Sequence, residues 1–379
     1  MRVLVTGGAG FVGSHTVDLL LAGDHDVAVL DSLDPQVHGE IDGLPPNLRQ
    51  HQGNPRFTFI RGDVRDRAVL QSALTGAEAV LHLAAAVGVG QSMYQPFHYC
   101  SVNVGGTAQL LDVLATGGTQ VRKVVVASSM SIYGEGAYRC GACNAPAAAS
   151  RGDGQLANRQ WEPHCPSCGE ALEAIPTKEG KTLAATSIYA SSKRSQEELV
   201  LCFGSAFRLP VVALRYFNIY GPRQSLANPY TGVAAIFMSR LLNKKPAIVF
   251  EDGRQTRDFI HVRDIARANL LALTCSGADY QAVNIGAGRP VSVLQIFEAL
   301  ARVLSMPVEP VVTGQFRAGD IRHCFSDSSL AHGGLGWTPQ VDLDAGLRDL
   351  VSWSLDPGTT SRDLVDQAYA ELDRLHLLR

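Results

Sequence analysis

Short apolar runs alternate with longer amphipathic stretches along residues 1–216. Residues 2–6 form an apolar run that ends in glycines, a helical pattern follows, and residues 26–31 form the next apolar run. A strand, a glycine turn, a helix and a second strand in this order make a βαβ unit, which implies a parallel sheet. Further strands are expected at residues 57–60, 79–83, 121–127 and 211–216, and helices at residues 67–74, 102–114 and 192–203. The pattern predicts a doubly wound α/β domain.

This rhythm breaks between residues 138 and 178, a stretch rich in Ala, Gly, Pro, Asn and Cys that shows little periodicity. We interpret it as an insertion into the α/β domain, which then comprises residues 1–137 and 179–215. Beyond residue 216 the pattern is mixed, with helices expected at 234–242, 294–304 and 361–379 and extended segments at 247–250 and 259–262. Residues 216–379 are therefore expected to form mainly a second, smaller α/β domain.

The composition narrows the class of protein. The chain has 379 residues, of which 46% are hydrophobic and 18% charged, so a large core is expected and bulk disorder is not. The formal net charge of −3 argues against a protein that coats nucleic acid or an anionic membrane. No apolar run is long enough to span a bilayer, and the N-terminus lacks the cleavage region of a signal peptide. A cytoplasmic protein is expected.

The first turn carries a dinucleotide-binding pattern. Gly7, Gly10 and Gly13 follow the first strand and open a helix, where a tight turn, close backbone approach and the positive helix end favour a pyrophosphate. Asp31 ends the second strand, where a carboxylate accepts hydrogen bonds from a ribose 2′-hydroxyl and repels a 2′-phosphate. This favours NAD over NADP. Asp63, after the third strand, could contact adenine or simply cap the next helix.

Tyr189 and Lys193 stand four residues apart, so in a helix they share one face. An ammonium beside the phenol is expected to lower the pKa of Tyr189 toward working pH. The phenolate could then take a hydroxyl proton while a nicotinamide takes hydride from the same carbon. Ser128 and Ser129, at the end of a strand, could supply a hydroxyl to the substrate oxygen.

The insertion contains two C-x-x-C pairs, Cys140 with Cys143 and Cys165 with Cys168. Four thiolates on two tight turns suit a tetrahedral, structural zinc in a ribbon-like fold, with free thiols or redox pairs as alternatives. The insertion has too few basic residues for a zinc ribbon that binds nucleic acid. Because the insertion joins the serine strand to the Tyr189 helix, it is also expected to cover the substrate pocket.

Together these residues resemble the extended short-chain dehydrogenase/reductase family, and within it the NAD-dependent nucleotide-sugar epimerases and dehydratases, with a Rossmann domain. The resemblance covers residues 1 to about 330 apart from the insertion. Its motifs are Thr6-Gly-Gly-Ala-Gly-Phe-Val-Gly13, Asp31, Asp63-Val64, His82-Leu-Ala-Ala-Ala86, Asn103, Ser128-Ser129, Tyr133-Gly134, Tyr189 with Lys193, Arg215-Tyr-Phe-Asn-Ile-Tyr-Gly-Pro222 and Arg257-Asp-Phe-Ile-His-Val-Arg-Asp264.

The resemblance implies a role for each matching residue. Tyr189 would be the base, Lys193 its electrostatic partner and a ligand of the nicotinamide ribose, and Ser129 the hydroxyl that binds the sugar oxygen. Other cofactor contacts would come from Gly7, Gly10, Phe11, Val12, Gly13, Asp31, Asp63, Val64, Ala84, Ala85 and Asn103, and substrate contacts from Ser129, Asn218, Arg257 and Arg322. A homodimer packed through helices near residues 102–114 and 191–203 is also implied.

Met130 and Ser131 depart from the family's 4,6-dehydratases, which carry Asp-Glu there to eliminate water. Methionine cannot protonate a leaving hydroxyl, so a non-eliminating 4-epimerase is favoured. The segment Asp31-Ser-Leu-Asp-Pro-Gln-Val-His-Gly39, with the cysteine insertion, resembles bacterial dTDP-L-rhamnose 4-epimerases, which make dTDP-6-deoxy-L-talose. The alternatives are a UDP-hexose or UDP-uronate 4-epimerase, another dehydratase, decarboxylase or reductase of this fold, and a non-catalytic NAD-binding regulator.

Overall fold

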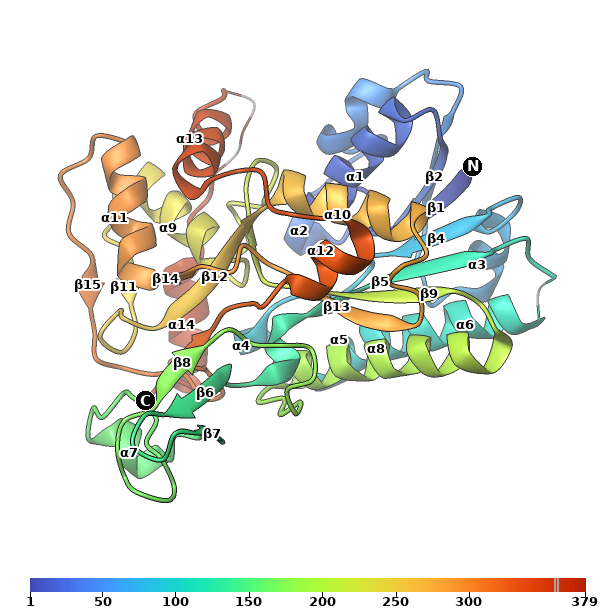
Figure 1. The fold of residues 1–379 in the computed structure, drawn as a ribbon. Helices are drawn as coiled ribbons and strands as arrows, with labels where there is room; N and C mark the ends of the chain where they lie inside the picture. Colours follow the sequence, from blue (N-terminus) through green and yellow to red (C-terminus); the bar gives the residue numbers. More distant parts are fainter. Residues whose placement is uncertain (117, 358, 360) are drawn as a thin grey trace.

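A parallel seven-stranded sheet forms the centre of the computed structural model, which describes residues 1–116, 118–357, 359 and 361–379 (Figure 1). The strands lie in the order β13, β9, β5, β4, β1, β2, β3. Their bounds are β1 Arg2–Thr6, β2 Asp26–Asp31, β3 Phe57–Arg61, β4 Ala79–His82, β5 Lys123–Ser129, β9 Val211–Tyr216 and β13 Gln281–Ile285. The predicted doubly wound α/β fold is confirmed.

Helices cover both faces of this sheet. Successive residues of a strand point to opposite faces, so Val3 and Val5 of β1 pack into one apolar cluster and Leu4 into the other. One face carries α1 (Phe11–Ala22), α10 (Val262–Thr274) and α12 (Ser329–Leu335), and the other α3 (Arg67–Ala73), α6 (Gly106–Thr116) and α8 (Ile188–Phe207). Burial on both faces explains why the strands read as continuous apolar runs.

Three expectations for the elements need correction. The helix expected at residues 192–203 extends over Ile188–Phe207, so Tyr189 lies in its first turn. The helix expected at 102–114 is divided into a π-helix, η2 (Cys100–Gly105), and α6. Residues 216–379 also return to the larger domain, because β13 pairs with β9 and α10 packs on α1. The interrupted apolar pattern beyond residue 216 did not show this return.

The second domain packs helices α9 (Val233–Leu242), α11 (Val293–Val303) and α13 (Leu343–Ser354) on a small mixed sheet. That sheet consists of β10 (Asn218–Tyr220), β12 (Thr256–His261), β14 (Pro290–Ser292) and β16 (His323–Cys324). A separate pair joins β11 (Ile248–Val249) to β15 (Val311–Val312), and the tail forms α14 (Val365–Arg374). Short helical turns are α2 (Pro35–His38), η1 (Pro46–His51), α4 (Val89–Ser92), α5 (Pro96–Tyr99) and η3 (Met130–Tyr133).

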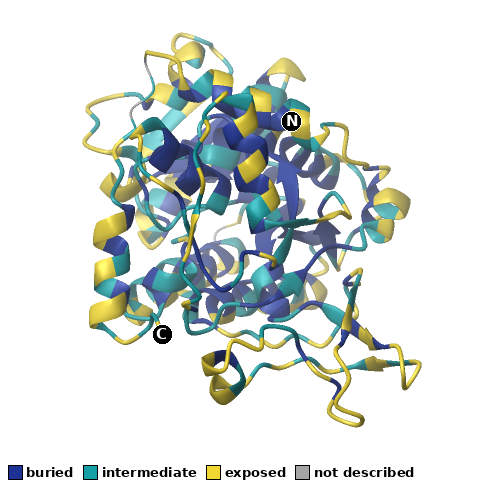
Figure 2. Ribbon diagram, turned by 90° about the vertical axis from the view of Figure 1, so that its left-hand side faces the viewer, coloured by how far each residue is buried: buried dark blue, intermediate teal, exposed yellow. Residues whose placement is uncertain are grey.

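The insertion forms its own antiparallel sheet, in which β6 (Ala137–Cys140) lies between β7 (Ala145–Ala147) and β8 (Glu173–Ile175). A short helix, α7 (Asp153–Ala157), lies between β7 and β8 in the sequence. Its small core contains Tyr138, Cys140, Cys165 and Leu172. Figure 2 shows the deeply buried central sheet and the projecting, largely exposed outer loops of the insertion. So few buried side chains cannot hold such a loop by themselves.

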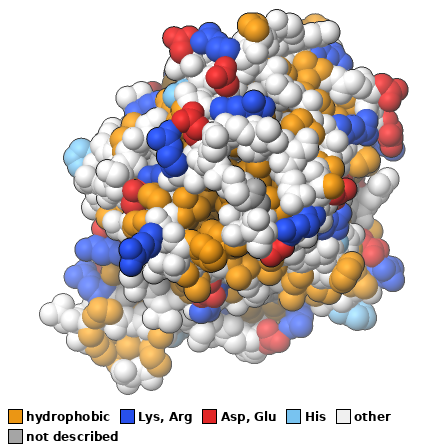
Figure 3. Space-filling view, turned by 90° about the vertical axis from the view of Figure 1, so that its right-hand side faces the viewer, with side chains coloured by type: hydrophobic (Ala, Val, Ile, Leu, Met, Phe, Trp, Pro, Cys, Tyr) orange, Lys and Arg blue, Asp and Glu red, His pale blue; other side chains and the backbone are white. Residues whose placement is uncertain are grey.

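Basic and acidic side chains are interspersed over the face shown in Figure 3, with apolar side chains between them. None of the helices in the described part of the chain has the length and apolar character needed to cross a membrane.

Candidate active site

A cleft of about 610 Å³ opens between the carboxyl edge of the central sheet and the second domain. Its walls include Gly7 after β1, Asp31 at the end of β2, Asp63 after β3, Ala84 after β4 and Ser129 at the end of β5. Parallel strands bring their carboxyl ends to one edge, which is where open α/β sheets bind ligands. The topology thus collects residues from widely separated parts of the chain.

The glycine loop has the close packing that a dinucleotide site requires. Gly7 has φ +70°, and a Cβ there would lie 2.7 Å from the backbone nitrogen of Ala84. A Cβ on Gly13 would lie 2.3 Å from the carbonyl oxygen of Gly7. Gly10 caps α1 without a side chain, which leaves the helix N-terminus open to the cleft beside Phe11 and Val12. The residues present therefore fit a pyrophosphate on the helix end.

Asp31 is buried and organises this loop. Its carboxylate accepts hydrogen bonds from the backbone nitrogens of Ala9 (3.0 Å) and Leu33 (2.9 Å). Asp63 accepts bonds from Arg65, which lowers the pKa of its carboxyl, and lines the same cleft with Val64. Both carboxylates face the end of the cleft that would hold the adenosine half of a dinucleotide.

Asn103 has a positioning role. Its side-chain oxygen accepts from the backbone nitrogen of Ala86 at 2.7 Å, and its nitrogen donates to Ser192 Oγ at 2.9 Å. Ala84 and Ala85 line the cleft, whereas Asn103 lies behind the loop and is not among its lining residues. It fastens the loop after β4 to helix α8.

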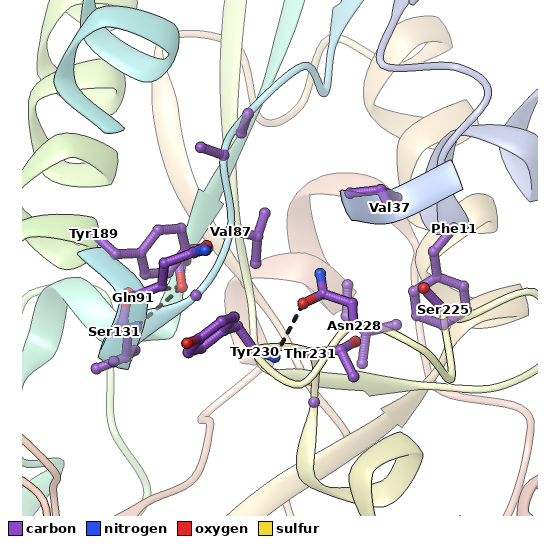
Figure 4. A pocket seen from close by; sticks show the side chains of 18 of the residues that line it. Phe11, Val37, Val87, Gln91, Ser131, Tyr189, Ser225, Asn228, Tyr230 and Thr231 are labelled. Carbon is purple, nitrogen blue, oxygen red and sulfur yellow. Dashed lines mark hydrogen bonds between the residues drawn. The ribbon is translucent and has the colours of Figure 1, made fainter. Parts of the chain in front are cut away.

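Tyr189 and Lys193 lie on one face of α8, one turn apart, and both line the cleft. The Lys193 ammonium donates to the carbonyl oxygen of Ala127 (2.8 Å) and to Gln196 Oε1 (2.8 Å). The Tyr189 ring packs edge-on against Tyr99, with ring centroids 6.3 Å apart. Figure 4 shows Tyr189 on the cleft wall near Gln91 and Ser131.

The expected lowering of the Tyr189 pKa is not what the structure shows. Burial raises the pKa of Tyr189, and the nearby Ser129 hydroxyl acts in the opposite direction. Burial also lowers the pKa of Lys193 to about 7. The ammonium is directed to Ala127 and Gln196, so desolvation dominates for both groups. An ionised Tyr189 needs additional positive charge in the cleft.

The two strand-end serines have different environments. Ser128 Oγ donates to Glu197 Oε2 at 2.6 Å, and Glu197 also binds the buried Arg215. Ser129 Oγ instead accepts bonds from the backbone and hydroxyl of Ser131, at 3.2 and 2.9 Å. Ser129 therefore presents its hydroxyl to the cleft beside Tyr189, while the proton of Ser128 is committed to the protein interior.

The second domain supplies the opposite wall of the cleft. Arg257 lines it, and so does Arg317, whose guanidinium carbon lies 4.9 Å over the Phe250 ring centroid. Asn218 lines it too, as predicted for the substrate side. Buried amide oxygens of Asn218, Gln224 and Gln255, all of them lining residues, have no hydrogen-bond partner among the described residues. Unpaired buried acceptors fit the donor groups of a polar ligand.

Arg322 does not fit its expected role as a phosphate ligand. It is 1% exposed, does not line the cleft, and donates to Glu162 Oε1 (2.6 Å), Glu251 Oε2 (2.9 Å) and Asp252 Oδ1 (2.7 Å). Three carboxylates saturate its guanidinium, which leaves no donor for a substrate.

The insertion brings its four cysteines together. The expectation that it covers the cleft is wrong. The sulfurs of Cys140, Cys143, Cys165 and Cys168 all lie within 4.8 Å of one another, with distances of 3.5 Å (Cys140–Cys168) and 3.9 Å (Cys143–Cys165). Tetrahedral zinc with bonds of about 2.3 Å places its sulfurs about 3.8 Å apart, so the cluster fits that metal. None of residues 138–178, all of which are described, lines the cleft.

Sequence reasoning missed the residues that close the cleft. Gln36 in α2 and Gln91 in α4 exchange two amide hydrogen bonds, and Gln36 also reaches Asn228 Oδ1 at 3.4 Å. Tyr230 and Asn228 lie on the facing loop, where Asn228 accepts from the Tyr230 backbone (Figure 4). Gln36 and Gln91 lie in helices of four residues, and Asn228 and Tyr230 lie in a loop. Such short segments carry no periodic signal, so only their proximity reveals these residues.

Comparison with known proteins agrees with this geometry. Residues 4–140 match the family described as GDP-mannose 4,6 dehydratase, and residues 166–286 match the NAD dependent epimerase/dehydratase family. A dTDP-L-rhamnose 4-epimerase of Burkholderia thailandensis is 34% identical over 93% of this chain and 94% of its own. A mouse UDP-glucose 4-epimerase is 33% identical over 93% of this chain and 96% of its own.

Solved structures show the same fold. The UDP-glucose 4-epimerase of Thermotoga maritima with UDP-glucose has a TM-score of 0.75 at 31% identity, covering 93% of this chain and 98% of that one. The UDP-glucuronic acid 4-epimerase of Bacillus cereus, in complex with UDP-glucuronic acid and NAD, has a TM-score of 0.75 at 28% identity with the same coverage.

Proposed function

Because the chain belongs to the NAD-dependent epimerase/dehydratase family, within the extended short-chain dehydrogenases/reductases, we propose that it inverts carbon 4 of a nucleotide sugar with NAD as cofactor. One observation carries the proposal. Ser129, Tyr189 and Lys193 lie on the wall of the same cleft that the glycine loop, Asp31 and the second domain enclose. A cofactor site and a substrate site therefore meet at a phenol–ammonium pair.

Each residue has a defined task in this reaction. Ser129 donates a hydrogen bond to the oxygen on carbon 4, and Tyr189 takes the proton of that hydroxyl. NAD, held by the glycine loop, Asp31 and Lys193, would supply a reversible acceptor for the hydride of carbon 4 and a positive charge that favours the Tyr189 phenolate. Between removal and return of the hydride, the 4-keto sugar rotates to present its opposite face. Tyr189 then gives the proton back to the oxygen on carbon 4. Arg257 and Arg317 hold the diphosphate throughout.

Met130 and Ser131 favour epimerisation over elimination. Both line the cleft next to Ser129, and Met130 packs in an apolar cluster with Tyr133 and Phe217. Loss of water from carbons 5 and 6 needs an acid and a base at these positions in the related dehydratases. A thioether and a hydroxyl supply neither at neutral pH, so the keto sugar is expected to be reduced again without losing a group.

The finer proposal is that dTDP-L-rhamnose is converted to dTDP-6-deoxy-L-talose. The similarity to the dTDP-L-rhamnose 4-epimerase of Burkholderia thailandensis supports this proposal. Of the described residues lining the cleft, only Arg65, Lys193, Arg257 and Arg317 carry an Arg or Lys side chain. Lys193 serves the reaction, Arg65 binds Asp63 and the other two belong to the diphosphate, which leaves no such partner for the carboxylate of a uronate. A neutral sugar is favoured.

A panel of dTDP- and UDP-sugars tests the proposal. The purified protein is incubated with each sugar in deuterated water without added NADH, and the products are separated and analysed by mass spectrometry and NMR. We expect a 4-epimer with all carbon-bound hydrogens retained. Deuterium at carbon 5 or a product lacking water contradicts epimerisation, and turnover of UDP-sugars alone contradicts the dTDP-sugar proposal.

We further propose that Cys140, Cys143, Cys165 and Cys168 hold a structural zinc ion. Four protein thiolates complete a tetrahedral shell, so the metal has no free position for substrate and its contribution is to folding of the insertion. We also propose a homodimer through α6 and α8, in keeping with the exposed Phe207, which stacks on Phe203 at 4.3 Å. Sedimentation analysis tests this state, and a monomer at micromolar concentration contradicts it.

A further inference from the structure

The insertion is joined to the second domain by a network of buried ion pairs. Arg151, from the insertion, contacts Glu135 Oε1 at 3.1 Å and Glu251 Oε1 at 2.7 Å. The side chains of Arg151 and Glu251 are each 3% exposed. Arg151 also donates to the carbonyl oxygens of Trp161 and Asp320. An arginine with this many partners is fixed in one geometry.

Arg322 is the second cation of the network. It binds Glu162 of the insertion and, together with Arg151, shares Glu251 of the second domain. The backbone nitrogen of Arg322 donates to Glu135, at 2.8 and 2.9 Å to its two oxygens. The side chains of Arg151 and Arg322 are 3% and 1% exposed, whereas Glu162 is 43% exposed at the edge of the network. Removing a partner of a buried charge is costly, so the two arginines and the carboxylate of Glu251 that they share hold one another in place.

The network ends at the cleft. The carbonyl oxygens of Ile321 and Arg322 accept hydrogen bonds from Arg257, at 2.7 Å from Nη2 and 2.9 Å from Nη1. Ile321 and Arg257 line the cleft, whereas Arg151 and Arg322 do not. The backbone around Arg322 thus contacts the ion-pair network through its nitrogen and the guanidinium of the cleft-lining Arg257 through its carbonyl oxygens.

We propose that the insertion positions the phosphate-binding Arg257, with Arg151 and Glu162 as positioning residues that act through Arg322. This inference rests on the proposed function in assigning Arg257 to a nucleoside diphosphate. Arg151 and Glu162 both lie between Cys143 and Cys165, so the cysteine cluster closes the loop that carries them. The insertion contributes to substrate affinity from outside the cleft.

Binding of UDP and dTDP by isothermal titration calorimetry tests this directly, because it requires no turnover. We expect Arg151→Met to weaken the binding of the diphosphate that the wild type binds by roughly tenfold. For the active sugar, the same variant is expected to raise KM with kcat within about twofold, since the contact it disturbs is not with the reacting carbon. Arg139→Met is the matched control, because Arg139 lies in the same insertion and forms an exposed pair with Glu173.

A double-mutant cycle separates positioning from general loosening of the fold. If Arg151 acts through Arg257, then Arg151→Met in an Arg257→Gln background changes the diphosphate Kd by less than about twofold. An equal loss in both backgrounds overturns the inference, and so does an unchanged Kd in the single variant. Should Arg151→Met fail to fold, Arg151→Lys keeps the charge, loses the planar fork and is tested in the same cycle.

The two proposals fail separately. A wild-type protein that binds UDP or dTDP but epimerises no sugar contradicts the proposed function and leaves the cycle to decide on Arg151. A wild-type protein that binds neither diphosphate overturns the inference.

Discussion

The side-chain amides of Gln36 and Gln91 exchange two hydrogen bonds, of 3.0 and 2.8 Å, between the loop after β2 and the loop after β4. Gln91 is 6% exposed and also accepts from the Tyr99 hydroxyl at 3.0 Å. Both glutamines line the cleft. The pair therefore links two strand ends that would contact opposite halves of a dinucleotide.

This link is expected to retain the cofactor. Gln36→Ala removes both reciprocal bonds, and we expect NAD to dissociate roughly 30-fold faster, because each bond contributes about 1 kcal/mol and about 1.4 kcal/mol corresponds to a factor of ten. NAD content after extensive dialysis and the dissociation rate by fluorescence measure the effect. Gln50→Ala is the control, since Gln50 forms an exposed bond with Asp18 away from the cleft. Equal NAD retention in the two variants would show that the pair has no such role.

Removal of the Tyr189 hydroxyl tests the assigned base. Tyr189→Phe is expected to lower kcat at least about 100-fold, because general acid–base groups contribute that much or more. The ring remains packed against Tyr99, so Tm and NAD content should stay close to those of the wild type. Tyr280→Phe, at an exposed surface tyrosine, is the control. Activity of Tyr189→Phe within about tenfold of wild type would exclude Tyr189 as the base.

Buried His82 predicts a loss of stability in acid. Thr107 Oγ1 donates to the Asn103 carbonyl and so accepts from His82 Nε2, while Nδ1 accepts from Thr6. Burial lowers the pKa of His82 to about 3. Between pH 3 and 6.5 the unfolded chain binds more protons at His82 than the folded chain does. The contribution of His82 to the free energy of unfolding therefore falls as the pH falls.

The expected size of this contribution is about 2 kcal/mol of unfolding free energy lost between pH 7.5 and pH 5. Urea unfolding at the two pH values measures it. The His82→Gln variant keeps one donor and one acceptor. In this variant, the difference in unfolding free energy between pH 7.5 and pH 5 should be smaller by about 2 kcal/mol. An unchanged difference would assign the acid sensitivity to other groups, such as His15 and His261, whose pKa values burial lowers to about 4.

Metal removal is expected to affect stability before chemistry. Elemental analysis should find about one zinc ion per chain, and Cys143→Ser should lose most of it together with several degrees of Tm. Cys100→Ser is the control, because Cys100 is exposed in η2, outside the cluster and outside the proposed dimer helices α6 and α8. A metal-free wild-type protein with the same Tm as after zinc addition would contradict a structural site.

Apolar runs and local motifs were enough to predict the layered α/β fold and the positions that carry the chemistry. Strands β1, β2 and β9 have the predicted bounds, because each contains a run of three or four apolar residues that a parallel sheet buries on both faces. The glycine loop and the spacing of Tyr189 and Lys193 could be predicted because they depend on local backbone geometry. The C-x-x-C pairs are local in the same way.

The surroundings of those residues depend on how distant parts of the chain pack together. Lys193 could not be known to bind Ala127, nor Tyr189 to have a raised pKa, because desolvation depends on elements far apart in sequence. Arg322 stands near a cleft-lining segment yet faces three carboxylates drawn from the insertion and the second domain. The direction of a side chain and the partners it meets result from packing between distant segments, which no local pattern records.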